Sequence, residues 1–171
     1  MNLQPDNPKT YAGIGSRKTP LDILNQMEEI GNFMSHWGYT LRSGGASGAD
    51  TAFERGCDAA DGQKEIYVPW IGFNGRKDGI VGAHGKSLAM AQQYHPAWDR
   101  CSPGARKLHA RNCCQILGLT LDDPVQLVVC WSPGHGGTEQ ALRIAKDYQI
   151  PIFNLKDPKR YDDLIRFIRS F

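Results

Sequence analysis

Short apolar segments alternate with longer stretches of helical periodicity along almost the whole chain, and this alternation constrains the fold more than any other feature. The apolar segments predict five strands, at residues 10–14, 39–42, 64–68, 125–130 and 151–154. The stretches between and after them predict helices, at residues 20–37, 49–60, 86–94, 105–117, 138–148 and 161–171. Such alternation is typical of a parallel sheet with helices on both faces. Because crossovers between parallel strands are right-handed, we expect an α/β fold, a three-layer α/β/α sandwich with a mainly parallel five-stranded sheet in the order 3-2-1-4-5.

The length of 171 residues suits one domain, since domains typically span about 100–200 residues. A chain of this size buries enough surface to fold without a metal or disulfide bonds. We therefore predict a single domain over residues 1–171. The pattern weakens at residues 70–103, which we predict to form a lid-like insertion, because long loops in compact domains are often functional.

The charge is nearly balanced, with 20 basic and 18 acidic side chains and a net charge of +2. This balance does not indicate non-specific binding to a nucleic-acid backbone, although a local basic patch remains open. Apolar runs stay well short of the ~18–20 residues of a membrane span. Residues 1–10 are polar and have no apolar signal stretch. We expect a cytoplasmic protein without a membrane partner.

The five cysteines are odd in number and form no CxxC pair. We expect reduced thiols that are mostly buried. The five histidines show no metal-ligand spacing, so we expect no metal and no cofactor. His135 is the one histidine that stands out, because it lies within a glycine-rich segment.

Glycine-rich loops follow three of the predicted strands, all at the edge of the sheet where ligands bind in open α/β folds. In the first loop, Gly13 and Gly15 allow close approach of a ligand, while Ser16 and Arg17 offer polar groups to a phosphate. Thr19 and Pro20 predict the start of the following helix, with Thr19 as its N-cap. The alternative is a tight strand–helix turn with a surface arginine.

The second loop has the highest density of glycine and serine. We predict that it forms a phosphate nest, made by Ser43, Gly44, Gly45, Gly48 and Ala49. Asp50 comes directly after it, in the first helical turn. Its carboxylate is placed for contact with ribose hydroxyls or for acid–base chemistry, although it would also interact favourably with the helix dipole.

The third loop follows the most apolar strand. Its backbone amides at Gly136, Gly137 and Thr138 are candidates for holding an anion, and Glu139 is a candidate catalytic carboxylate. The alternative is a glycine-rich turn with Thr138 as an N-cap. We also predict that aromatic side chains stack on a base, namely Trp70, Phe73, Trp98 and Trp131. A hydrophobic cluster that pins the 70–103 segment is the alternative for the first three.

The segments AGIGSR, SGGASGAD, ARN and GGTEQA together resemble the SLOG superfamily, which includes DprA proteins and LOG phosphoribohydrolases. The resemblance implies a Rossmann-like fold that binds nucleotides or their derivatives. It places Arg111 at the catalytic arginine of LOG enzymes, with Asn112 beside it. The LOG glutamate falls at Gln140, and Glu139 lies one position earlier. A shift of one residue turns a helical side chain by ~100°, so the LOG reaction is less well supported than the fold.

Two functional hypotheses follow. In the first, the protein hydrolyses the N-glycosidic bond of a small nucleotide, with Asp50, Arg111 and Glu139 as catalytic residues. In the second, it is a non-catalytic DprA-like single-strand DNA binder, or a protein that senses or sequesters a nucleotide signal. The expected partners are therefore a small nucleotide or single-stranded DNA. The resemblance also suggests a homo-oligomer.

Overall fold

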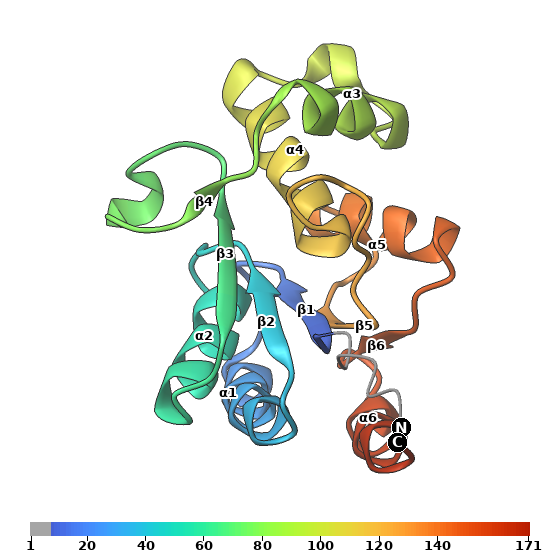
Figure 1. Ribbon diagram of the computed structural model, residues 1–171. Helices are drawn as coiled ribbons and strands as arrows, with labels where there is room; N and C mark the ends of the chain where they lie inside the picture. Colours follow the sequence, from blue (N-terminus) through green and yellow to red (C-terminus); the bar gives the residue numbers. More distant parts are fainter. Residues whose placement is uncertain (1–7) are drawn as a thin grey trace, which may run out of the picture.

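The computed structural model describes residues 8–171. Within this part of the chain the strands are β1 (Thr10–Gly15), β2 (Thr40–Ser43), β3 (Lys64–Val68), β4 (Ile80–Val81), β5 (Leu127–Trp131) and β6 (Ile152–Asn154). The α-helices are α1 (Leu21–His36), α2 (Ala49–Ala59), α3 (Gly85–Tyr94), α4 (Pro103–Leu117), α5 (Gly137–Asp147) and α6 (Lys159–Arg169). Two short 3-10 helices are η1 (Phe73–Gly75) and η2 (Trp98–Arg100). Figure 1 shows the sheet between two groups of helices.

The sheet order is β4-β3-β2-β1-β5-β6, and all of its strand pairs are parallel. This confirms the predicted α/β fold, since the five expected strands lie in the expected order. The structure adds β4, which pairs with β3 at the outer edge. Strand β4 was not predicted, because a segment of two residues has no periodicity to detect.

Two hydrophobic cores lie on opposite faces of the sheet. One core contains side chains of α1, α2 and α6, with Tyr11 and Phe53 fully buried at its centre. The other contains side chains of α4 and α5, including Ile116 and Ile144, with Ala91 of α3. Alternate residues of β5 enter the two cores, as expected for a strand covered on both faces.

The loop after β1 differs in detail from the prediction. Helix α1 begins at Leu21 rather than Pro20, and Thr19 does not cap it. The Thr19 hydroxyl instead donates to the backbone oxygen of Ser16 at 2.6 Å. This bond stabilises the turn between β1 and α1, so Thr19 shapes the loop.

Residues 70–103 contribute β4 to the sheet edge and α3 to a layer packed on α4 (Figure 1). Their role as a lid stays a prediction.

All five cysteines have free thiols, and four of them are buried, as expected. Among the helices of the described residues, none has the length and apolar character that a membrane span requires.

Helices α1 and α2 approach closely because each has a glycine at the crossing. A Cβ on Gly56 would clash with the backbone oxygen of Glu28 and lie 2.9 Å from the Asn32 nitrogen. A Cβ on Gly31 would lie 3.1 Å from the nitrogen of Cys57. The contacts at both glycines are with backbone atoms, which cannot rotate away. Any side chain at Gly31 or Gly56 must therefore separate the two helices.

We predict that Gly56→Ala lowers the free energy of unfolding by on the order of 3 kcal/mol, because overpacking a close contact forces the backbone to shift. Gly85→Ala is the matched control, since a Cβ on Gly85 would meet no atom within 4 Å. We expect that control to stay within about 0.5 kcal/mol of the wild type. Urea denaturation followed by circular dichroism measures both, and equal stability of the two variants would contradict the prediction.

Candidate functional site

A cavity of about 720 Å³ lies where β1 and β5 end, next to α4. Its lining comes from the first loop (Gly15 to Lys18), the third loop (Pro133 to Thr138) and one face of α4. The second loop contributes Ala46 and Asp50. Residues from three separate loops therefore meet at one edge of the sheet, at the crevice where strand order reverses.

The structure brings many of the predicted site residues to this cavity. Those that line it are Gly15, Ser16, Arg17, Asp50, Arg111, Asn112, Trp131, Gly136, Gly137 and Thr138. Others lie outside the lining, namely Gly13, Ser43, Gly44, Gly45, Gly48, Ala49, Glu139, Trp70, Phe73 and Trp98. Most residues of the second group hold the first group in place or pack in the core.

The glycines of the second loop act mainly as close-packing positions. A Cβ on Gly44 would lie 2.6 Å from Arg111 Nη1 and 2.7 Å from Asp50 Oδ2. Gly48 has a φ of +88° and packs beneath the first loop, where a Cβ would lie 3.1 Å from the Cα of Arg17. Gly45 faces Arg76 rather than the cavity. The second loop therefore supports the first loop and leaves space for the buried charged groups.

Asp50 and Arg111 are buried ionisable groups in the cavity lining, with relative exposures of 4% and 5%. The Arg111 guanidinium donates to the backbone oxygens of Gly44 and Tyr67, the latter at 3.1 Å. Asp50 Oδ2 accepts from the Ala46 amide at 3.2 Å. Burial raises the pKa of Asp50 from 3.8 to about 6, even though the positive charge of Arg111 opposes that shift.

The first and third loops are held by their own hydrogen bonds. The Ser16 amide donates to the backbone oxygen of Trp131 at 3.2 Å, which joins the two loops. Ser132 is fixed to β6, because its amide donates to Asn154 Oδ1 at 3.1 Å and its backbone oxygen accepts from Asn154 Nδ2 at 3.1 Å. These bonds fix the backbone around the cavity before any ligand arrives.

Glu139 does not line the cavity. Its Oε1 accepts a hydrogen bond of 2.5 Å from the Ser132 hydroxyl, so its carboxylate is engaged within the third loop. Gly136 precedes α5 at a φ of +95°, and α5 begins at Gly137 without a side-chain cap. Thr138 is therefore not an N-cap. A Cβ on Gly136 or Gly137 would meet no atom within 4 Å, so this end of the loop is open.

Arg111 and Asn112 of α4 were predicted from the sequence, but the rest of the wall that α4 contributes was not. Leu108, Asn112 and Gln115 recur along one face of the helix, and His109 lies beside them. The Gln140 side-chain oxygen accepts from Asn112 Nδ2 at 3.4 Å and lies 3.3 Å from His109 Nδ1. The helical spacing of these polar residues is a signal that the sequence does contain. This spacing identifies site residues only when it is known which face of α4 meets the loops.

The aromatic side chains of the 70–103 segment pack on the protein. Phe73 is buried, with the Arg111 guanidinium carbon 5.4 Å from its ring centre. Trp70 forms an edge contact with Phe73 at 5.5 Å between ring centres, and Trp98 packs against Arg106. Trp131 is the predicted stacking residue that does line the cavity.

The rim of the cavity is basic. Arg17 and Lys18 are exposed, and neither forms an ion pair with another residue in the described range 8–171. Asp50 is the one carboxylate among the residues that line the cavity, and it is buried. The site therefore has the charge that favours a phosphate.

Two solved structures share the fold across nearly the whole chain. DNA processing protein A from Helicobacter pylori, whose single-stranded DNA binding mode has been described, matches with a TM-score of 0.60 at 16% identity. The match covers 96% of this chain and 82% of that one. DprA from Streptococcus pneumoniae matches with a TM-score of 0.59 at 19% identity, over 93% of this chain and 56% of that one.

Neither a protein-family model nor a curated protein matches the sequence. The structural similarity therefore shows a shared fold, and DprA proteins belong to the same Rossmann-like group that the motifs resemble. A shared fold does not by itself determine function, which depends on the residues of the site.

We predict that Asp50→Asn changes how stability depends on pH. Because the pKa of Asp50 is raised on folding, the stability that this group contributes is complete below its unfolded value near 4 and is lost as the pH rises through about 6. Asparagine keeps the shape and removes the titration. Relative to Asp50→Asn, the wild type should lose on the order of 2 kcal/mol between about pH 4 and pH 7.

Urea denaturation of both proteins across this pH range gives the difference directly. Asp162→Asn, at an exposed position of α6, is the matched control and should follow the wild type. A constant difference between wild type and Asp50→Asn at every pH would contradict the raised pKa.

Proposed function

We propose that this protein binds single-stranded DNA and holds a backbone phosphate in the cavity. The observation that carries this proposal is the exposed pair Arg17 and Lys18, which lines the same cavity as the open N-terminus of α5. Backbone amides at a helix N-terminus and unpaired cations both favour a phosphate.

The loop backbone supports a phosphate site in a second way. Gly136 and Gly137 carry no side chain that would screen their backbone, and the space around them is open. Asn154 and Ser132 hold the third loop in a fixed conformation. A preorganised loop loses little conformational entropy when it binds an anion, which favours affinity.

The arrangement of carboxylates supports binding over hydrolysis. Glycosidases usually need two carboxyl groups that flank the scissile bond. Here Glu139 is bonded to Ser132, which leaves Asp50 as the one carboxylate in the lining. Of the three predicted catalytic residues, Asp50 and Arg111 therefore line the cavity and Glu139 does not.

Single-stranded DNA is the favoured ligand for two reasons. The fold is that of DNA processing protein A, for which a single-stranded DNA binding mode has been described. Trp131 lines the cavity, and an aromatic ring beside a phosphate site can stack on an unpaired base. Stacking of this kind contributes about 1–3 kcal/mol per base.

We expect the double variant Arg17→Ala/Lys18→Ala to weaken binding of a fluorescent oligothymidylate by about tenfold or more at low salt, because two phosphate contacts are lost. The slope of log K against log salt should fall in magnitude by about 1.4, since each single-strand phosphate contact contributes about 0.7. Fluorescence anisotropy over a salt series measures both quantities.

The matched control is Lys159→Ala/Arg169→Ala, which removes one lysine and one arginine from exposed positions of α6. It has the same net charge as the test variant and should bind like the wild type. Equal weakening in both double variants would show that total charge, rather than this cavity, determines binding.

Hydrolysis of the N-glycosidic bond of a nucleotide is a second candidate, favoured by one observation. Asp50 is a buried carboxyl with a pKa of about 6, and carboxyl groups with shifted pKa values in cavities are common in active sites. Its protonated form would supply a proton to a leaving base.

If this second candidate is correct, purified protein releases free base from nucleoside monophosphates, and Asp50→Asn abolishes the release. Chromatography of the reaction mixture measures the base. Nucleotides that bind and stay intact would contradict hydrolysis and support a protein that binds or sequesters nucleotides.

A further inference from the structure

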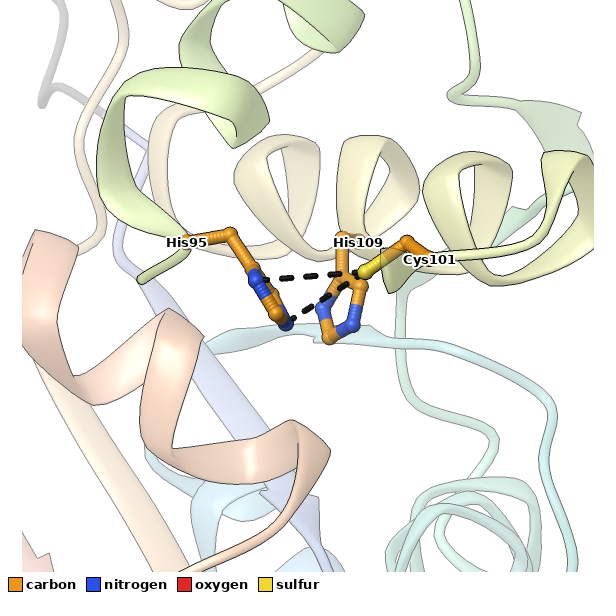
Figure 2. Close-up of side chains that lie close together, drawn as sticks. All are labelled: His95, Cys101 and His109. Carbon is orange, nitrogen blue, oxygen red and sulfur yellow. Dashed lines mark hydrogen bonds between the residues drawn. The ribbon is translucent and has the colours of Figure 1, made fainter. Parts of the chain in front are cut away.

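Three side chains outside the loops of the cavity converge on one point. His95 follows α3, Cys101 follows η2, and His109 lies in α4. Figure 2 shows the three side chains turned toward one another. One donor atom from each lies within 4.8 Å of the other two, and no other group of three or more such side chains occurs in residues 8–171.

We propose that His95, Cys101 and His109 form a zinc-binding site with one thiolate and two imidazole ligands. The spacing is H-x5-C-x7-H, which matches none of the common zinc patterns, so residue spacing alone does not indicate this site. The proposal does not depend on DNA binding or on nucleotide hydrolysis.

The distances suit a tetrahedral ion. Cys101 Sγ lies 3.7 Å from His95 Nε2 and 3.9 Å from His95 Nδ1. Around zinc, with Zn–S bonds of about 2.3 Å and Zn–N bonds of about 2.0–2.1 Å, sulfur and nitrogen ligands lie about 3.5 Å apart. The ring centres of His95 and His109 are 4.4 Å apart at an interplanar angle of 61°, so the rings do not stack face to face. The three donor atoms all lie within 4.8 Å of one another, which is close enough for them to share one ion.

The surroundings of His109 leave a nitrogen free for a metal. Its Nδ1 lies 3.3 Å from the side-chain oxygen of Gln140, and this bond requires a proton on Nδ1. Nε2 of the neutral ring then carries the lone pair that a metal needs. Histidine ligands commonly donate their second N–H in this way, which fixes the ring orientation. Gln140 is fully buried, so it holds this orientation firmly.

His95 and Cys101 must each give up one interaction. The His95 Nδ1 accepts from the Ala97 amide at 3.0 Å, and a metal on either ring nitrogen replaces that bond. Cys101 bonds to the Ala97 backbone oxygen at 3.6 Å through a thiol proton that is released when zinc binds. Both of these bonds are made to backbone atoms of Ala97, which lies in the short loop before η2. That loop can adjust without disturbing the core. Cys101 is also the cysteine that is not buried.

The ligand set indicates the class of metal. A mixture of thiolate and imidazole favours zinc over magnesium or calcium, which prefer oxygen ligands. Three protein ligands leave the fourth tetrahedral position to water, as in catalytic zinc sites. His109 also lines the cavity, so the ion would lie at the cavity edge.

Cobalt(II) is the probe, because it replaces zinc in tetrahedral sites and a bound thiolate gives it a charge-transfer absorption in the near ultraviolet. Reduced protein that has been freed of metal is titrated with Co²⁺, and Zn²⁺ is then added. We expect one Co²⁺ per chain, a charge-transfer band, and loss of that band as Zn²⁺ displaces cobalt. We also expect Zn²⁺ to raise the melting temperature of the wild type, since a ligand that binds the folded state stabilises it.

The variants identify the ligands. Cys101→Ser should lose the charge-transfer band, and His95→Gln and His109→Gln should each weaken Co²⁺ binding at least tenfold. His36→Gln is the matched control, because His36 is exposed on α1, on the opposite face of the sheet, and should bind cobalt like the wild type. Far-ultraviolet circular dichroism of the metal-free variants verifies that each is folded.

Three results would overturn the proposal. The first is a wild type that gives no charge-transfer band with excess Co²⁺. The second is a band that survives in Cys101→Ser, because another thiolate would then be the ligand. The third is a His36→Gln variant that loses as much affinity as His109→Gln.

Discussion

The buried guanidinium of Arg111 connects the parts of this structure that form the cavity. It donates to the backbone oxygens of Gly44 and Tyr67, which lie at the ends of β2 and β3, and so fixes α4 against that edge of the sheet. Removing it would leave two buried carbonyls without a donor, which is costly in a protein interior. Phe73 packs against the guanidinium, and Asp50 supplies a nearby negative charge. This arrangement requires a glycine at position 44, because the side chain of any other residue there would collide with Arg111.

Next to Arg111, the cavity combines loops that have a rigid backbone with exposed, positively charged side chains. The loops are held by bonds within the protein, such as those between Ser132 and Asn154, so their amides do not depend on a ligand for their position. Arg17 and Lys18 remain exposed at the rim. A rigid, basic and glycine-rich surface favours binding of a phosphate group, while the Glu139 carboxylate accepts a hydrogen bond from Ser132 and lies outside the cavity lining. His109 links this cavity to the proposed zinc site through α4.

The sequence predicted the loops better than it predicted the side chains that surround them. The first and third loops reach the cavity as expected, because any loop that follows a parallel strand must lie at that edge. A Cβ on the glycines of the second loop would meet Arg17, Arg76 or Arg111, so these glycines permit close packing, and their binding of phosphate stays a prediction. Trp70 and Phe73, predicted either to stack on a base or to form a hydrophobic cluster, contact each other. An irregular segment has no periodicity from which the direction of an aromatic side chain can be deduced.

The sequence by itself determined five of the six strands, their order and the edge at which the loops gather, because hydrophobic periodicity and right-handed crossovers are local properties of the chain. Only the tertiary structure decided which side chains face the cavity, since that depends on how α4 lies across the sheet. It also decided that Glu139 bonds to Ser132 and that His95, Cys101 and His109 meet. Contacts between residues on separate elements depend on the distances and angles between those elements, and residue spacing along the chain does not encode them.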